Sequence, residues 1–234
     1  MKDYLLFIDT EASGLPRKWN LPYSRENNWP HALQASWIIY SKDQKEIKRE
    51  DHYINESDFE ISPQAFEIHK ITRELLSSRG ESRRSVMQLL ADDLKKYKPL
   101  VIGHFLELDY HVLAADFYRS DVANPFHDEA LPAFCTMLGS TKYVRNPSAR
   151  YVRLGELYNS LFNRDFENPH NALADAGATA DCFFELLNRG DITEKNIEDQ
   201  KLNLNIQQYE TKRPGWVLLG LLLIIILIIV LGNA

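Results

Sequence analysis

An apolar run at residues 4–8 ends in two carboxylates, Asp9 and Glu11, and then in a turn that contains Gly14. An apolar run that meets turn residues predicts a strand followed by a loop. Side chains at positions i and i+2 of a strand point to the same face, so Asp9 and Glu11 are expected to project into one spot. Two like charges repel there unless a cation joins them, and hard oxygen ligands suit Mg²⁺ or Mn²⁺. A solvated strand end is the alternative for this pair.

Two later segments place acidic residues in comparable positions. Residues 101–103 form a short apolar stretch that ends in a glycine, and a helix is expected to begin near Asp109. Residues 169–181 combine a proline with an alanine-rich, helix-forming run, which places His170 at the helix entry and Asp175 about one turn inside. Asp109 alone could simply be a favourable partner of a helix dipole. Together, the order and spacing of these residues fit a two-metal site for phosphodiester cleavage.

Three patterns carry a resemblance to a known family. They are Asp-x-Glu-x-x-Gly-Leu at residues 9–15, Gly-His-x-x-x-x-Asp at 103–109 and His-x-x-x-x-Asp at 170–175. In this order they resemble the motifs of the DEDDh (DnaQ-like) 3′-to-5′ exonucleases, which include polymerase III epsilon-type proofreading subunits, oligoribonuclease, ribonuclease T and the three-prime repair exonucleases. Residues 63–72 add the similar pattern Pro-x-Ala-x-x-x-His-x-Ile-Thr. The resemblance implies an α/β fold with a ribonuclease-H-like mixed sheet flanked by helices.

The same resemblance implies a role for each residue of the site. Asp9, Glu11 and Asp175 would hold the first of two Mg²⁺ or Mn²⁺ ions, and Asp9 and, through water, Asp109 would hold the second. Two such cations about 4 Å apart can generate a nucleophilic hydroxide, neutralise the phosphate and stabilise the leaving oxygen. His170 would be the general base that takes the proton of the attacking water, a task for which histidine is suited as a residue type.

Four further residues are expected to contact the substrate. Gly14 would let the backbone approach the 3′ end, and Leu15 would wedge against the last base as in relatives, although a buried loop leucine is the alternative. His104 and Phe105 belong to the second motif, where relatives often carry His-Asn, with Phe directly before the Asp. The chain instead has Phe105 and, before the aspartate, Leu108. We expect this departure to affect substrate preference more than reaction type.

The net charge of −6 disfavours a broad basic face for nucleic acid. Basic and aromatic residues nevertheless alternate in two segments, residues 17–29, which include Trp19 and Trp29, and residues 142–153. Such segments can hold a single strand by phosphate contacts and base stacking. Loops with exposed charges and buried rings are an equally good interpretation.

A long apolar run, residues 216–231, contains no charged or polar side chain. It is short for a transmembrane helix but sufficient when the flanking glycines are counted, and a buried core helix is disfavoured because every face is aliphatic. Lys212 and Arg213 precede the run, so the positive-inside rule places the preceding domain in the cytoplasm. We therefore predict a single-pass, tail-anchored membrane protein.

The predicted organisation has three parts: an exonuclease domain at residues 1–190, a polar tether at 191–213 and a transmembrane tail anchor at 214–232. Within the domain we expect strands at residues 4–9, 33–40, 50–54 and 100–103, and helices at residues 63–69, 82–97, 110–118, 154–162 and 171–188.

The sequence thus predicts a membrane-tethered, metal-dependent 3′-to-5′ exonuclease that acts on DNA 3′ ends, with single-stranded DNA as the expected partner and no protein partner indicated. An RNA exonuclease is a second possibility, because the motifs do not distinguish the sugars. A catalytically silent membrane scaffold that binds nucleic acid is a third, and the presence of all five catalytic residues disfavours it.

The membrane prediction can be tested by fractionation. Full-length protein should stay with membranes through alkaline carbonate washing, whereas a chain stopped after Arg213 should be released, because it lacks the segment whose insertion is favourable. Extraction of the full-length chain by carbonate would refute a spanning helix.

Overall fold

A computed structural model describes residues 1–129 and 131–204 of the chain. The strands are β1 (Tyr4–Ala12), β2 (Ala32–Ser41), β3 (Glu46–Tyr53), β4 (Leu100–Gly103) and β5 (Ala133–Cys135). The α-helices are α1 (Pro63–His69), α2 (Arg73–Arg79), α3 (Arg83–Tyr97), α4 (Leu106–Ser120), α5 (Pro125–Asp128), α6 (Thr136–Gly139), α7 (Leu154–Phe162), α8 (Ala172–Asn188) and α9 (Glu194–Asp199), with a 3₁₀ turn, η1, at Thr141–Tyr143.

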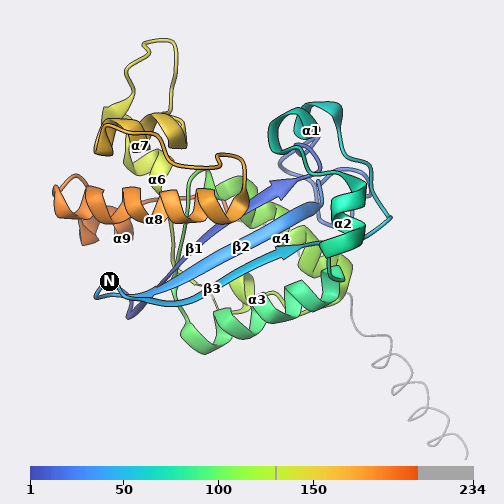
Figure 1. Ribbon diagram of the computed structural model, residues 1–234. Helices are drawn as coiled ribbons and strands as arrows, with labels where there is room; N and C mark the ends of the chain where they lie inside the picture. The colour runs from blue at the N-terminus through green and yellow to red at the C-terminus, as the bar shows by residue number, and fades with distance from the viewer. Residues whose placement is uncertain (130, 205–234) are drawn as a thin grey trace, which may run out of the picture.

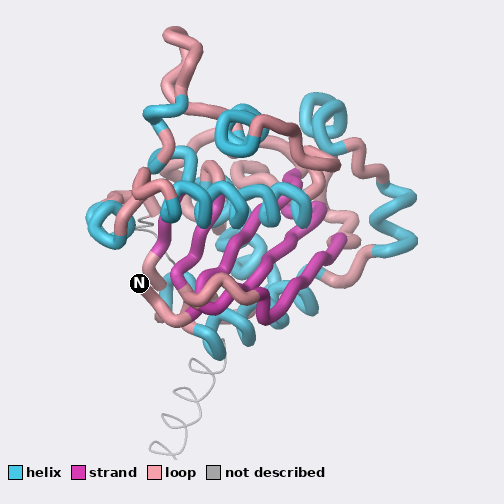
Figure 2. Tube along the Cα trace, turned by 60° about the vertical axis from the view of Figure 1, so that its left-hand side comes forward, coloured by secondary structure: helices cyan, strands magenta, loops and turns pink. Residues whose placement is uncertain are grey.

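The strands form one mixed sheet in the order β3-β2-β1-β4-β5. β1 pairs antiparallel with β2 and parallel with β4, while β2–β3 is antiparallel and β4–β5 is parallel. Helices lie on both sides of this sheet (Figure 2). The predicted α/β, ribonuclease-H-like mixed sheet flanked by helices is therefore confirmed.

The alternation of side chains along β1 divides the core into two layers. Leu6 and Ile8 face a cluster supplied mainly by α3 and α4, whereas Leu5 and Phe7 face a cluster supplied by α7 and α8. Figure 1 shows α7 and α8 on one side of the sheet and α3 on the other. Because side chains alternate strictly, the face that carries Leu5 and Phe7 continues into Asp9 at the end of the strand.

Local signals explain why several predicted helices were placed well. Ser62 and Ser82 accept hydrogen bonds from the backbone N–H groups three residues on, and so cap α1 and α3. Pro63 occupies the first turn of α1, where its missing N–H group costs nothing. The expected strands and helices all occur. β4, α1 and α7 have the predicted limits, α3 and α8 begin one residue later than predicted, and the ends of the others differ by up to four residues. β5, α2, α5, α6 and α9 were not expected.

Residues 191–204, the described part of the predicted tether, pack on the domain. Ile192 and Ile197 are buried in the cluster beneath α8. The Gln200 side chain accepts a hydrogen bond from the backbone N–H of Cys135 and donates one to its carbonyl oxygen, and so pairs with the edge strand β5. The predicted limits of the domain and tether remain predictions.

The predicted tail anchor at residues 214–232 lies outside the described residues. Within residues 1–129 and 131–204, no helix has both the length and the apolar character needed to cross a membrane.

Candidate active site

The end of β1 brings the first two carboxylates to the α8 side of the sheet. Glu11 is buried, with 8% of its surface exposed, and it lies opposite Gln34 in the β1–β2 pairing. Beyond Ala12 the chain leaves the strand, and Ser13 fixes the turn that follows. The Ser13 hydroxyl accepts the N–H of His31, and the Ser13 carbonyl accepts the N–H of Ser62. The predicted pair therefore sits at a strand end that is held from two sides.

The first turn of α4 brings Asp109 to the same strand. Its Oδ1 atom accepts hydrogen bonds from the Thr10 N–H, at 3.0 Å, and from the Thr10 hydroxyl, at 2.8 Å. Asp109 is 4% exposed. These two bonds join the second motif to the first across 99 residues of sequence.

The start of α8 supplies the remaining two predicted residues. Asn171 caps the helix, because its side chain accepts the N–H of Ala174. His170 has a φ of 64°, in the left-handed region, and its backbone N–H donates to Asp175 Oδ2 at 3.3 Å. One side-chain ligand atom from each of Glu11, His170 and Asp175 lies within 4.8 Å of the other two. The fold thus assembles residues that are far apart in the sequence.

Gln34 on β2 holds this helix start in place. Its Oε1 atom accepts the N–H of Ala172 at 3.2 Å, and its amide donates to Asp51 at 2.7 Å. Because Gln34 lies beside Glu11 in the sheet, the bond to Ala172 brings the N-terminus of α8 next to that carboxylate. This role could not be predicted from local sequence signals, because Gln34 is one polar residue within a predicted strand.

Burial raises the pKa of all four carboxyl groups in the site, and repulsion from neighbouring carboxylates adds to the rise for Asp9, Glu11 and Asp109. The pKa of Asp9 is raised well above its ordinary value by burial and by the charges of Asp109, Asp175 and Glu11. Burial, followed by the charges of Asp175 and Asp109, raises the pKa of Glu11 to about 8. Burial raises the pKa of Asp109 to about 7, against the hydrogen bonds from Thr10, and that of Asp175 to about 6. The four groups therefore resist carrying full charge without a cation.

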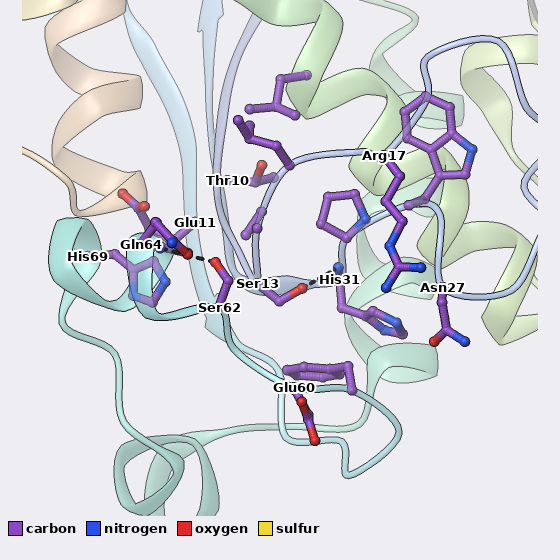
Figure 3. Close-up of a pocket in the computed structure, with 18 of the residues that line it drawn as sticks. Thr10, Glu11, Ser13, Arg17, Asn27, His31, Glu60, Ser62, Gln64 and His69 are labelled. Atoms are coloured by element: carbon purple, nitrogen blue, oxygen red, sulfur yellow. Dashed lines mark hydrogen bonds between the residues drawn. The ribbon is translucent and has the colours of Figure 1, made fainter.

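A cavity of about 1040 Å³ adjoins Glu11. Figure 3 shows Glu11, Gln64 and His69 together on one side of it, and Arg17, Asn27 and His31 on the other. The cavity is also lined by the predicted substrate-binding residues Gly14 and Leu15.

Leu15 and Gly14 both leave room at this cavity. Leu15 is 72% exposed, which excludes the alternative of an ordinary buried loop leucine. A Cβ atom added to Gly14 would meet Ser62 Oγ at 3.4 Å, which is an ordinary contact. The protein itself therefore does not require a glycine there, and close approach of a ligand remains the expected reason for it.

The two predicted substrate-binding residues of the second motif, His104 and Phe105, have different environments in the structure. His104 has both ring nitrogens engaged within the protein, Nδ1 with Thr136 Oγ1 and Nε2 with the carbonyl oxygen of Val152, each at 3.0 Å. Burial lowers the pKa of His104 to about 4, against the bond to Val152. These bonds favour a structural role for His104. Phe105, in contrast, is 36% exposed.

The two basic and aromatic segments, residues 17–29 and 142–153, also contain both exposed side chains and side chains engaged within the protein. Trp29 is 3% exposed and its indole N–H donates to the Leu21 carbonyl, which favours the alternative of a buried ring at this position. Trp19 is 39% exposed. In the second segment, Lys142 and Tyr143 bond to the Asp191 carboxylate.

A model of the RNase_T exonuclease family matches residues 6–183 of the chain. The chain belongs to this exonuclease family. The match confirms the family and the enzyme class that the motifs indicated, the DEDDh-type 3′-to-5′ exonucleases. A search of curated proteins gave no significant match.

Solved structures with a similar fold include E. coli exonuclease I in complex with a dA16 oligonucleotide, at 18% identity and a TM-score of 0.65, where the match covers 84% of this chain and 42% of that chain. The complex of E. coli exonuclease I with a dT13 oligonucleotide matches at 20% identity and a TM-score of 0.64, over 80% of this chain and 41% of that one. The zinc-bound form of the E. coli enzyme with single-stranded DNA matches at 19% identity and a TM-score of 0.65, over 85% and 42% of the two chains. The matched region is thus less than half of those enzymes.

Membership of this exonuclease family implies divalent metal ions, and the residues present fit such ions. Asp175 Oδ1 is buried and has no hydrogen-bond partner among the described residues. A buried carboxylate oxygen without a partner is costly, and a cation ligated there would remove the cost. The carboxylate oxygens of this candidate site are donors that suit hard divalent cations such as Mg²⁺ and Mn²⁺.

The raised pKa values predict how the metal-free exonuclease responds to pH. A carboxyl group with a raised pKa binds more protons in the folded than in the unfolded state, so the free energy of unfolding falls as pH rises. Without metal, we expect a loss on the order of a few kcal/mol between about pH 5 and pH 8, through the pKa values of about 6 to 8 cited for the site. Thermal melting of the full-length chain in detergent with EDTA measures it.

Saturating Mn²⁺ should reverse this loss and raise the melting temperature by ~5 to 10 °C at one hundred times its dissociation constant. Asp109→Asn keeps an oxygen acceptor for Thr10 but removes one charge, so it should flatten the pH dependence. A melting temperature that responds neither to Mn²⁺ nor to pH would contradict the site.

Replacement of Gln34 tests how α8 is held. Gln34→Leu leaves the Ala172 N–H without its acceptor, so it should lower the free energy of unfolding by about 1 to 3 kcal/mol. It should also weaken Mn²⁺ binding, because Asp175 and His170 depend on the position of the helix start. Gln88→Leu, at an exposed position of α3, is the matched control. If both variants behave alike, Gln34 does not position the site.

Proposed function

We propose that the chain removes nucleotides from the 3′ ends of DNA, with a preference for single strands, by hydrolysis that requires two Mg²⁺ or Mn²⁺ ions. One observation carries the proposal. Four carboxylates from β1, α4 and α8 meet beside His170, and one of their oxygens, Asp175 Oδ1, is buried without a partner among the described residues. The match to the exonuclease family supports the reaction class.

Asp9, Glu11 and Asp175 would hold one ion, and Asp9 and, through water, Asp109 the other. When bound, the ions supply charge neutralisation for the phosphate and a more acidic water. His170 is exposed and lies beside Glu11 and Asp175, so its ring can receive a proton from a water molecule at that position. The hydrogen bond from the His170 backbone N–H to the Asp175 carboxylate restrains the backbone that carries the His170 ring. Water adds its oxygen to phosphorus, and the 3′ oxygen of the preceding nucleotide leaves and is protonated.

The preference for a single strand rests on the shape of the site and on the relatives. The cavity beside Glu11 receives the terminal nucleotide, with Leu15 exposed at its wall and Gly14 leaving the backbone accessible. The E. coli exonuclease I structures contain single-stranded oligonucleotides. A paired end would have to separate before its last base could enter the cavity, which costs pairing energy.

The proposal includes a membrane tether, argued from the sequence alone. Residues 214–232, which lie outside the described residues, have the apolar character of a spanning helix, and Lys212 and Arg213 precede them. The nuclease domain would then face the cytoplasm.

Activity assays test the proposed reaction. Full-length protein in detergent with Mn²⁺ should shorten 5′-labelled single-stranded DNA stepwise from its 3′ end, and duplex DNA and RNA of the same sequence more slowly. Asp175→Asn should abolish turnover, because asparagine has nearly the same shape as aspartate but lacks the negative charge of a metal ligand. His170→Ala should reduce turnover about a hundredfold or more.

Asp92→Asn is the matched control, because Asp92 is an exposed helical aspartate on α3, away from the site. Near-normal turnover by Asp175→Asn would contradict the site assignment. Faster shortening of RNA than of DNA would instead make the chain an RNA exonuclease with the same catalytic residues.

A further inference from the structure

Phe105 has a backbone conformation that its side chain does not favour. Its φ is 69° and its ψ is 39°, in the left-handed region, at the residue that precedes α4. A bulky residue is an outlier there, whereas asparagine tolerates this region and can cap a helix. Phe105 makes no side-chain capping bond to the described residues. The chain thus retains a strained phenylalanine at a position where its side chain contributes nothing to helix capping.

The Phe105 ring is exposed and lies against a second exposed ring. The centroids of Phe105 and Trp19 are 6.0 Å apart, and 36% and 39% of the two residues are exposed. Trp19 in turn contacts Trp29, which is buried, stacks on His111 at 4.9 Å and donates its indole N–H to the Leu21 carbonyl. Two exposed rings therefore rest on a fixed aromatic base.

Neither ring lines the catalytic cavity itself, but each of the two residues contacts or is hydrogen-bonded to a residue that does. Trp29 and Leu108 both line that cavity together with Glu11. The Phe105 carbonyl accepts the N–H of Leu108, and Asp109 follows directly. Phe105 and Trp19 are thus tied, through one residue each, to the cavity wall and to a proposed metal ligand.

We propose that Phe105 and Trp19 form a stacking platform for the bases that precede the 3′-terminal nucleotide of a single strand. The proposal deepens the proposed function and rests on it. With a net charge of −6 the chain is poorly suited to hold a strand mainly by phosphate contacts, whereas stacking on aromatic rings needs no charge. Backbone strain of this kind persists at binding sites, where the strained side chain has a task.

Substrates of two lengths distinguish an effect on base stacking from an effect on the hydrolysis step. A dinucleotide offers one base beyond the terminal nucleotide, while a twelve-residue oligo-dT offers enough bases to occupy both rings. Full-length Phe105→Asn and Trp19→Ala should lose kcat/KM on the longer substrate more than on the dinucleotide, with an excess loss of about 5-fold to 150-fold for each stacked base. Phe105→Trp, which keeps a ring, should retain the natural preference for length.

Phe66→Ala is the matched control, because Phe66 on α1 is 37% exposed, nearly the same as Phe105, and is not among the residues that line the catalytic cavity. It should preserve the ratio of the two rates. Phe105→Asn should also raise the melting temperature by ~2 to 8 °C, because asparagine relieves the left-handed strain and can cap α4.

The outcomes distinguish the two levels of the proposal. If the natural chain cleaves neither substrate, the proposed function fails and the platform with it. If it cleaves both and Phe105→Asn leaves their ratio unchanged, only the platform is refuted, and the rings serve packing. A fall in melting temperature for Phe105→Asn would refute the strain on which the inference depends.

Discussion

The gathering of four carboxylates at one end of the sheet is the constraint on which the rest of the site depends. Each of these groups is held where burial disfavours its charge, and for Glu11 burial and the charges of its neighbours raise the pKa to about 8. Only a few contacts offset the cost. Thr10 donates two hydrogen bonds to Asp109, and the N-terminus of α8, which carries a partial positive charge, lies beside Glu11. An exonuclease site of this kind is therefore locally unfavourable, and the surrounding core must hold it together.

The core positions the carboxylates through three separate elements, β1, α8 and α4. The two-layered packing around β1 fixes the face on which Asp9 and Glu11 emerge. The bond between Gln34 and Ala172 fixes where α8 begins, and α4 presents Asp109 from the opposite side of the strand. Because each element is anchored by its own contacts, the ligands are positioned before any ion binds. Such preorganisation is what metal-assisted phosphodiester cleavage requires.

Local sequence signals predicted more of the fold than of the supporting contacts. The start of α1 follows from Ser62 and Pro63, and the apolar run before Asp9 predicted β1. β5 was not predicted, because it has three residues and is defined by its pairing with β4 and by Gln200, far along the chain. The role of Gln34 was not predictable for the same reason, since its partners come from α8 and β3. Motif spacing predicted which candidate catalytic residues lie together, but not the contacts that hold them in place. His104 and Phe105 have adjacent places in one motif, but the bonds of the His104 ring to Thr136 and Val152, and the exposure and φ of Phe105, separate their roles.

Metal stoichiometry tests the central claim most directly. Equilibrium dialysis of the full-length chain in detergent against Mn²⁺ should give two saturable sites per chain at neutral pH, and Glu11→Gln, which removes a charge at the end of β1, should lose at least one of them. The absence of saturable binding by the natural chain, or an unchanged stoichiometry in Glu11→Gln, would contradict the assignment of these carboxylates as a joint metal site.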